Sequence, residues 1–155
     1  MNNPLYNGGG GEEDRDEDSF EYMSDKYTKE FDRWNEKKKR TDSKQDDARL
    51  YVHEREVWWC SVGVNVGSEI DGKNENFERP VLIMKVIGNG FFGIPLTSKQ
   101  KGHQYEVPVV HDKGTSYANV SQLRFLSRKR MLRKIGTVPD TDFMRVRDRL
   151  RDMFR

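Results

Sequence analysis

The sequence has little of several residue types on which common kinds of protein depend. It contains one cysteine, Cys60, in 155 residues, which excludes an internal disulfide and a cysteine-built zinc site. Its three histidines, His53, His103 and His111, lack the spacing of metal ligands, so we expect no metal site and no cofactor. No apolar run approaches the ~20 residues of a membrane span, and the N-terminus has no signal-peptide core. We therefore expect a soluble, cytoplasmic protein without a membrane partner.

The familiar sequence signatures of catalysis are also missing. There is no glycine-rich phosphate loop with its lysine, no His-Glu-x-x-His and no Gly-x-Ser-x-Gly. These absences argue against a nucleotide-hydrolysing P-loop enzyme, a zinc protease and a serine hydrolase.

Charge is abundant and unevenly divided. Lys and Arg total 28 against 26 for Asp and Glu, a net charge of +2. Residues 1–50 hold 14 acidic and 10 basic side chains, whereas residues 51–155 hold 12 acidic and 18 basic ones. The end of the chain, 124–155, carries 11 basic and 4 acidic residues. An acidic N-terminal part thus precedes a basic body. For the basic C-terminal segment, we favour a role in binding RNA phosphates over the alternative of a merely solvated helix face.

The N-terminal third divides into two segments. Residues 1–18 combine glycines with an acidic cluster and predict a disordered tail. Residues 19–49 predict an amphipathic helix followed by a polar linker, because apolar side chains recur at spacings of three and four. These side chains are Phe20, Met23, Tyr27, Phe31 and Trp34. Such a stripe must pack on the body, a second subunit or a partner, and we expect packing within a homodimer.

From Glu56 the pattern becomes that of short strands. We expect strands at 57–62, 80–87, 91–96, 105–110 and 116–120, the last one extended by 123–126. Asn89-Gly90 predicts a hairpin turn between the second and third strands. A short helix should follow Ser127 and end at Gly136, and a second should start at Asp140 or Thr141. The fold class is therefore α+β, mostly β, with a small curled antiparallel sheet.

The hairpin brings polar side chains toward one end of this sheet. With Asn89-Gly90 at the centre of the turn, Leu82 faces Thr97, and Arg79 lies three residues beyond, ~10 Å along the strand. A guanidinium side chain covers much of that gap. Arg79, Thr97 and Ser98 are thus predicted to meet.

Several short runs, in a fixed order, carry a resemblance to a known family. They are Glu56-Val57-Trp58-Trp59, Val66-Gly67-Ser68-Glu69, Gly72-Lys73, Arg79-Pro80-Val81-Leu82-Ile83, Ile94-Pro95-Leu96-Thr97-Ser98, Ser121-Gln122-Leu123-Arg124 and Lys134-Ile135-Gly136. Together they resemble the MazF/PemK toxins of type II toxin–antitoxin systems over about residues 54–155. The resemblance implies an SH3-like barrel of the MazF/PemK/CcdB type at 50–155 that dimerises. We expect this barrel to carry the predicted C-terminal helices, and the predicted N-terminal helix to be an addition outside the family core.

The resemblance also implies an activity. Members of the family cleave single-stranded RNA at short sequences without a metal ion, through attack of the ribose 2′-hydroxyl, leaving a cyclic phosphate and a 5′-hydroxyl. It implies inhibition of growth, and a cognate antitoxin whose C-terminal peptide blocks the RNA groove and through whose complex DNA is bound. Arg79 matches the family's catalytic arginine, and Thr97 its catalytic threonine. Further substrate contacts are expected from Ser98, Ser68, Glu69, Lys73, Gln122 and His103.

One position departs from the family. Ser121 stands where many relatives have an Asp that is a proposed general base in one branch. The proton acceptor is then Glu78, Glu69 or His103, or Arg79 acts with water. This departure keeps open a non-catalytic RNA- or protein-binding module of the same fold. A gyrase-poisoning toxin is a third hypothesis, against which the Arg79 and Thr97 pair argues.

Three further expectations concern particular residues and the acidic N-terminal part. Trp58 and Trp59 are candidates for stacking on bases, but on opposite faces of one strand at least one must be core, and we expect this to be Trp59. Cys60 should pack as a small apolar residue. The N-terminal helix, with the acidic residues 12–18, is a second candidate for covering the RNA groove.

Overall fold

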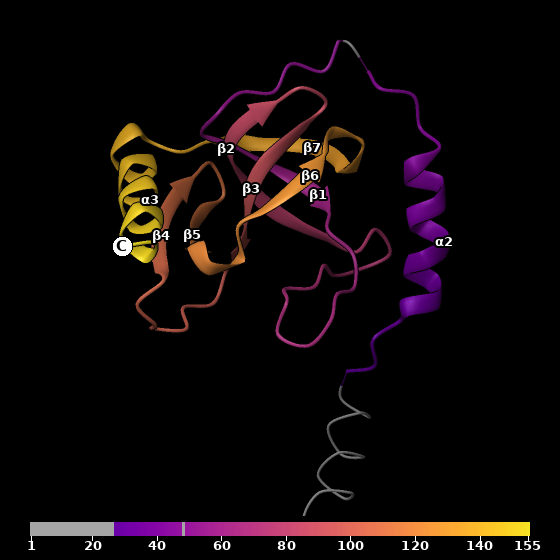
Figure 1. The fold of residues 1–155 in the computed structure, drawn as a ribbon, viewed down its shortest axis with the longest axis horizontal. Helices are drawn as coiled ribbons and strands as arrows, with labels where there is room; N and C mark the ends of the chain where they lie inside the picture. The colour runs from indigo at the N-terminus through magenta and orange to yellow at the C-terminus, as the bar shows by residue number, and fades with distance from the viewer. Residues whose placement is uncertain (1–26, 48) are drawn as a thin grey trace, which may run out of the picture.

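The computed structural model describes residues 27–47 and 49–155 (Figure 1). The predicted tail at 1–18 and the first part of the predicted N-terminal helix lie outside these residues. Within the described part the elements are two helices, seven strands and two single turns of 3-10 helix. They are α2 (Phe31–Asp42), β1 (Glu56–Ser61), β2 (Glu78–Ile87), β3 (Gly90–Thr97), β4 (Glu106–His111), β5 (Gly114–Asn119), η1 (Val120–Gln122), β6 (Arg124–Ser127), η2 (Arg128–Arg130), β7 (Met131–Thr137) and α3 (Asp140–Met153).

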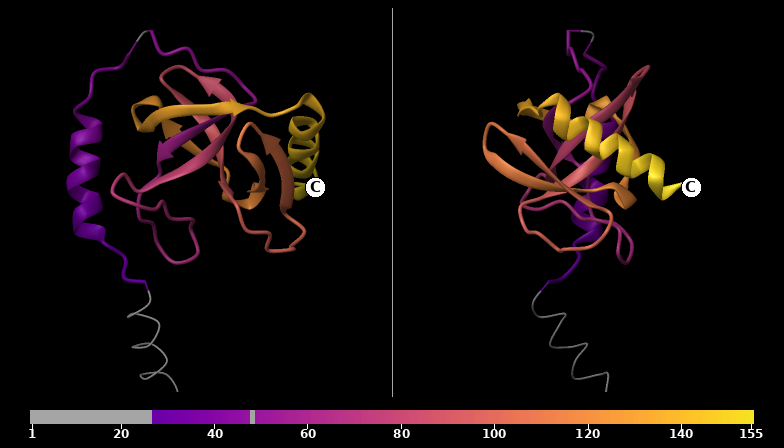
Figure 2. Two further views of the ribbon diagram at one scale, coloured as in Figure 1. Left: turned by 180° about the vertical axis from the view of Figure 1, so that it is seen from behind. Right: turned by 90° about the vertical axis from the view of Figure 1, so that its left-hand side faces the viewer.

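The strands form one antiparallel sheet in the order β4-β5-β3-β2-β1-β7, and β6 also pairs with β3. The long strand β3 is shared, because its first residues pair with β2 and β6 and its last two with β5. β6 and β7 are joined by η2 and pair with β3 and β1. The sheet therefore curls back on itself without closing, as the views in Figure 2 show. This confirms the predicted α+β fold with a barrel-like sheet.

Two apolar clusters form the core of this sheet. One lies between the sheet and α3, and it includes Phe143 and Val146 of the helix together with Val57, Leu82 and Ile94 of the sheet. The other lies inside the curled sheet, around Trp58, Cys60, Val62, Val81, Ile83, Phe91, Leu126 and Met131. Cys60 is fully buried there, which raises the pKa of its thiol and confirms the predicted packing role.

The β2–β3 hairpin exists, but its register differs from the predicted one. Ile87 pairs with Gly90, so Gly88 and Asn89 are the central turn residues, and Gly88 supplies the positive φ of 54° that such a turn needs. A further register shift at Met84 makes Val81 the partner of Pro95. If this pairing is continued by two residues, Arg79 lies level with Thr97. The predicted register places Arg79 three residues beyond the partner of Thr97.

The short helix predicted after Ser127 is wrong. The Ser127 side chain does accept a hydrogen bond from the Lys129 N–H, but it caps only the single turn η2. The chain then extends as β7. This strand pairs with the edge of β1 that β2 leaves open, and so satisfies the backbone hydrogen-bonding groups of β1 there. Residues 124–127 likewise form the separate strand β6 on β3, so the predicted extension of the preceding strand is also wrong.

The N-terminal helix begins at Phe31 and runs to Asp42, into the predicted linker. Its Trp34 is buried on Gly63, Val64 and Phe77 of the same chain, so no second subunit is needed to cover it. Helices α2 and α3 lie on opposite sides of the sheet (Figures 1 and 2). The described helices include none with the length and apolarity to cross a membrane.

Candidate active site

A cavity of about 180 Å³ lies at the end of the sheet where β2 begins and β3 ends. Four of the sequence-predicted site residues line it together, namely Lys73, Arg79, Thr97 and Ser98. The rest of its lining consists of Trp59, Asn74, Glu78, Pro80, Leu96, Lys99 and Ser116. The predicted meeting of Arg79, Thr97 and Ser98 is therefore confirmed, and the observed hairpin register is its physical cause.

The guanidinium of Arg79 is anchored by two backbone carbonyls. Its Nε donates to the Asp71 oxygen at 2.7 Å, and its Nη1 donates to the Leu96 oxygen at 3.2 Å. Partial burial lowers the pKa of Arg79 from its ordinary value, and the nearby Asp71 partly opposes this. Within the described part of the chain, no protein acceptor engages Nη2. A fixed cation thus keeps N–H donors available to an anion.

The pocket is cationic because its one acidic lining residue is already paired. Glu78 accepts from Arg133 through both carboxylate oxygens, at 2.9 and 3.1 Å, and this contact raises the pKa of Arg133. Lys73, Arg79 and Lys99 are the lining cations. With both oxygens occupied, Glu78 is poorly placed to accept a proton from a substrate.

Thr97 sits at the last position of β3 with a hydroxyl that can still donate. Its Oγ1 accepts the Lys99 N–H at 3.3 Å, which leaves the hydroxyl hydrogen for another acceptor. Thr97 and Arg79 therefore offer a neutral and a charged donor to one cavity.

The two tryptophans of β1 take the opposite places to those expected. Trp58 is the core residue, 8% exposed, and its indole N–H donates to Glu56 at 2.8 Å. Trp59 lines the pocket, and the Arg133 guanidinium lies 4.9 Å from its ring centroid. Alternation could not reveal this, because β1 pairs on both edges and all its residues except Trp59 are buried.

The other predicted site residues lie outside the cavity lining. Gln122 ties down the loop at 62–77, accepting from the Ile70 N–H at 3.1 Å and donating to the Ser68 carbonyl at 3.2 Å. Glu69 of the same loop is exposed. His103 is also exposed, and its Nδ1 accepts the Tyr105 N–H. None of these three side chains shares the pocket with Arg79.

Ser121 has a structural partner. Its hydroxyl donates to Asn119 Oδ1 at 2.6 Å, and its backbone N–H donates to the same atom at 3.1 Å. This pattern caps η1. The position thus serves the turn between β5 and β6 and supplies no carboxylate.

Sequence reasoning missed several residues that shape the site. Lys99 and Arg133 belong to none of the family runs, and the importance of Asp71 lies in its backbone oxygen, which no residue pattern reveals. The level placement of Arg79 and Thr97 follows from the observed strand register, which local sequence spacing does not reveal.

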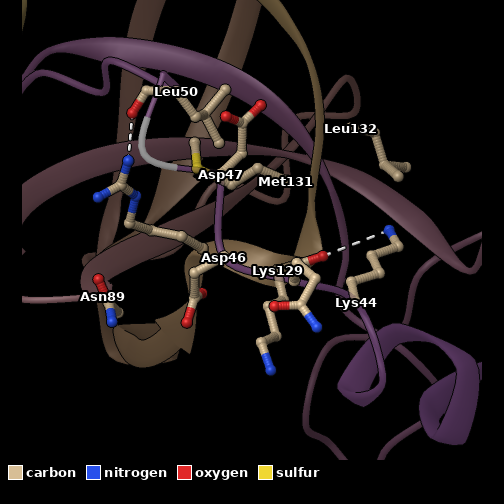
Figure 3. A pocket seen from close by; sticks show the side chains of 10 residues that line it. Lys44, Asp46, Asp47, Leu50, Asn89, Lys129, Met131 and Leu132 are labelled. Atoms are coloured by element: carbon tan, nitrogen blue, oxygen red, sulfur yellow. Dashed lines mark hydrogen bonds between the residues drawn. The ribbon is translucent and has the colours of Figure 1, made fainter.

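A second cavity, of about 320 Å³, lies under the connection between α2 and β1 (Figure 3). Its polar groups serve to hold that connection, since Arg128 donates to the Leu50 carbonyl and Lys44 Nζ to the Lys129 carbonyl at 3.4 Å. It contains no sequence-predicted site residue. Across residues 27–47 and 49–155, no cluster of three or more His, Cys, Asp or Glu side chains is arranged to hold a metal ion.

Several solved structures share the fold. MazF from Deinococcus radiodurans aligns with a TM-score of 0.58 and 22% identity, over 68% of this chain and 98% of that one. A MazE–MazF complex from the same organism gives 0.54 and 19%, over 68% and 97%. An endoribonuclease bound to its cognate antitoxin, from a mycobacterial species, gives 0.54 and 15%, over 67% and 95%. The structure thus has the MazF fold.

The sequence itself identifies the family. Residues 53–154 match the family described as PemK-like, MazF-like toxins of type II toxin–antitoxin systems. The chain belongs to this family. A comparison with curated protein sequences gives no match.

Proposed function

We propose that the protein is an endoribonuclease toxin that cleaves single-stranded RNA at short sequences without a metal ion and thereby inhibits growth. The observation that supports this best is the joint placement of Arg79 and Thr97 in one cationic pocket. Cleavage through a cyclic phosphate asks the protein for charge stabilisation and proton transfer, and this pocket offers the first directly.

Each residue has a chemical role in this proposal. The ribose 2′-oxygen bonds to phosphorus and gives up its proton, the bond from phosphorus to the 5′-oxygen breaks, and that oxygen gains a proton. Arg79 donates to the non-bridging oxygens as charge builds on them, since a guanidinium fits two phosphate oxygens. Thr97 donates to the 2′-oxygen or the phosphate. The flanking base and phosphates are contacted by the other lining residues Trp59, Lys73, Ser98 and Lys99.

The proton acceptor is one of the alternatives still open: Glu69, His103, or Arg79 acting with water. Glu69 and His103 would have to reach the substrate from outside the cavity lining. For Ser68, Glu69, Gln122 and His103 we therefore propose contacts with RNA beyond the scissile phosphate.

The test is mass analysis of the ends that purified protein generates on a defined mixed-sequence RNA. We expect 2′,3′-cyclic phosphate and 5′-hydroxyl ends, and loss of cleavage in Arg79→Ala and in Thr97→Ala with little change in fold. Arg147→Ala, an exposed arginine of α3, is the charge-matched control. Equal cleavage by all four proteins would show that the assigned pocket is not the active site.

Ser121 favours a second candidate, a non-catalytic RNA-binding module. Its hydroxyl is engaged by Asn119 and replaces a carboxylate common in relatives. Binding of the same RNA without new ends would support this candidate over the nuclease. A gyrase-directed toxin would produce neither result.

We also propose a cognate antitoxin and a homodimer for this chain. The support for an antitoxin is family membership together with the relatives whose structures are described as MazE–MazF complexes. Co-purification with the product of the neighbouring reading frame tests the antitoxin, and sedimentation of the purified chain tests the dimer.

A further inference from the structure

A segment outside the family-matched residues contacts the loop that holds the candidate catalytic arginine. This segment, the arm, comprises residues 27–42, whereas the family match begins at residue 53. The loop, residues 62–77, connects β1 to β2. Trp34 of the arm is 6% exposed and packs against Val64 and Phe77 of the loop, with its ring over Gly63. The arm is thus a fixed part of the described fold.

The start of the arm binds one acidic residue of the loop. Tyr27 donates its hydroxyl to Asp71 Oδ2 at 2.8 Å, and Lys29 Nζ lies 3.5 Å from the same oxygen. Lys29 also donates to the carbonyls of Asn65 and Gly67, at 2.7 and 3.2 Å. Burial, with the hydrogen bond to Asp71 next, raises the pKa of Tyr27 to about 12, so this hydroxyl remains a donor.

Asp71 connects the arm to the site. Its Oδ1 accepts the Asn65 N–H at 2.7 Å, and its backbone oxygen accepts Arg79 Nε at 2.7 Å. One residue therefore joins Tyr27 and Lys29 to the Arg79 guanidinium. Its carboxylate, which lies near that guanidinium, is turned to the arm and to Asn65, while only its carbonyl holds Arg79.

We propose that Tyr27 and Lys29 are positioning residues that hold the nearby Asp71 carboxylate out of an ion pair with Arg79 and so leave the guanidinium free for phosphate. A loop of this length without regular structure depends on such ties for a single geometry. Without the two arm contacts, the Asp71 carboxylate forms an ion pair with Arg79, which neutralises the charge needed in the transition state. The proposal rests on the proposed nuclease function.

The kinetic test compares variants of the full chain on a defined RNA. Lys29→Met and Tyr27→Phe should lower kcat about ten- to a hundredfold, the scale of a misplaced catalytic group, with KM changed less than about twofold. Lys29→Arg should retain activity. Lys39→Met, which removes an exposed lysine of the same arm paired only with Glu36 in the described structure, should behave as wild type.

A second substitution separates positioning from mere stability. Adding Asp71→Asn to Lys29→Met should restore most of kcat, because an amide cannot neutralise Arg79. Failure of this rescue, or wild-type kcat in both Lys29→Met and Tyr27→Phe, would overturn the proposal.

An NMR measurement keeps this inference separate from the nuclease activity. The Nε–Hε signal of Arg79, assigned by its loss in Arg79→Lys, should shift in Lys29→Met and not in Lys39→Met. A wild-type protein that cleaves no RNA refutes the proposed function, and the Arg79 signal then still decides whether the arm controls that side chain. An unchanged signal in Lys29→Met overturns the coupling.

Discussion

At the residue scale, Arg79 shows that the site requires several N–H donors in a fixed geometry as well as a positive charge. Its Nε and Nη1 are held by two carbonyls that face it from different elements, and only a planar guanidinium keeps further donors after making both bonds. A lysine at this position has one ammonium for all of these tasks.

Arg79→Lys should therefore lower the rate of RNA cleavage about 100-fold or more, as loss of a transition-state donor does elsewhere. The rate is measured under single-turnover conditions, with Arg147→Lys on α3 as the control. A rate within tenfold of wild type would mean that bidentate recognition is not the role of Arg79.

Glu56 is a second residue whose surroundings lead to a prediction. Its side chain is 5% exposed, and burial disfavours its charged form. Hydrogen bonds from Trp58, the His53 N–H and Lys134 outweigh burial and lower the pKa of Glu56. A carboxyl whose pKa is lowered by folding stabilises the fold above its ordinary value of 4.5 and loses this contribution as the pH falls through the lowered value.

Glu56→Gln should reduce the free energy of unfolding at pH 7 by about 1–3 kcal/mol and flatten the loss of this free energy as the pH falls below the ordinary carboxyl pKa of 4.5. Urea unfolding followed by circular dichroism measures both effects. Glu54→Gln, which removes an exposed carboxyl paired with Lys85, is the control. Equal acid sensitivity in wild type and Glu56→Gln would contradict the assignment.

At the element scale, the docking of α2 depends on one glycine. Gly63 has φ of 88°, and a Cβ on it would lie 2.2 Å from Trp34 Cε2. An alanine there is strained by its backbone and also displaces the indole. Gly67 offers a close comparison, because its φ is also positive, at 55°, but a Cβ would meet nothing within 4 Å.

Gly63→Ala should release α2, whereas Gly67→Ala should cost only the backbone strain of about 1 kcal/mol. Limited proteolysis of the connection between α2 and β1 and near-ultraviolet circular dichroism measure the release. If the two variants are cleaved at the same rate, Trp34 does not anchor the helix through Gly63.

The elements also show what sequence patterns determine. Strands β1 to β5 and helix α3 were predictable, because runs of β-branched, aliphatic and aromatic residues indicate strands and an apolar period of 3.6 residues indicates a helix. The register of the hairpin was not, since Gly88 could replace Asn89 as the residue with positive φ and the shift at Met84 has no local signal. The segment of β7 was predicted as a helix because the residues of β1 with which it pairs lie 71 to 81 positions earlier, so local spacing does not reveal the pairing.

For the candidate site, the family runs identify Arg79, Thr97, Ser98 and Lys73 by residue type and order alone. They could not identify Lys99 or the carbonyl of Asp71, which enter through the curvature of the sheet and the path of a loop. They also could not show that Trp59, and not Trp58, lines the pocket. Nor could they assign a place to Tyr27 and Lys29, which lie outside the family match.

At the scale of the whole molecule, charge is divided along the chain. Residues 1–26 carry eight acidic and two basic side chains, so the rest of the chain has a net charge of +8. Phosphate binding by this remainder is opposed by the acidic segment wherever the two are within a Debye length, ~10 Å at 0.1 M salt.

Removal of residues 1–26 in an Arg79→Ala background should tighten RNA binding several-fold at about 50 mM salt, and less at about 200 mM, because salt screens the repulsion. Fluorescence anisotropy of a labelled RNA measures this. Replacing the eight acidic residues by Asn and Gln in the full-length chain should give the same gain. Unchanged affinity in both proteins would show that the segment does not act through charge.

The placement of the three tryptophans has a consequence for how the molecule can be observed. Trp34 lies between the arm and the loop, Trp58 inside the curled sheet, and Trp59 at the pocket under Arg133. Each indole therefore samples a different layer, and proteins that retain one tryptophan at a time, with phenylalanine at the other two, would give three distinguishable emission signals. One would follow the release of the arm, one the unfolding of the sheet and one the arrival of RNA, so the order of these events could be timed in a single protein.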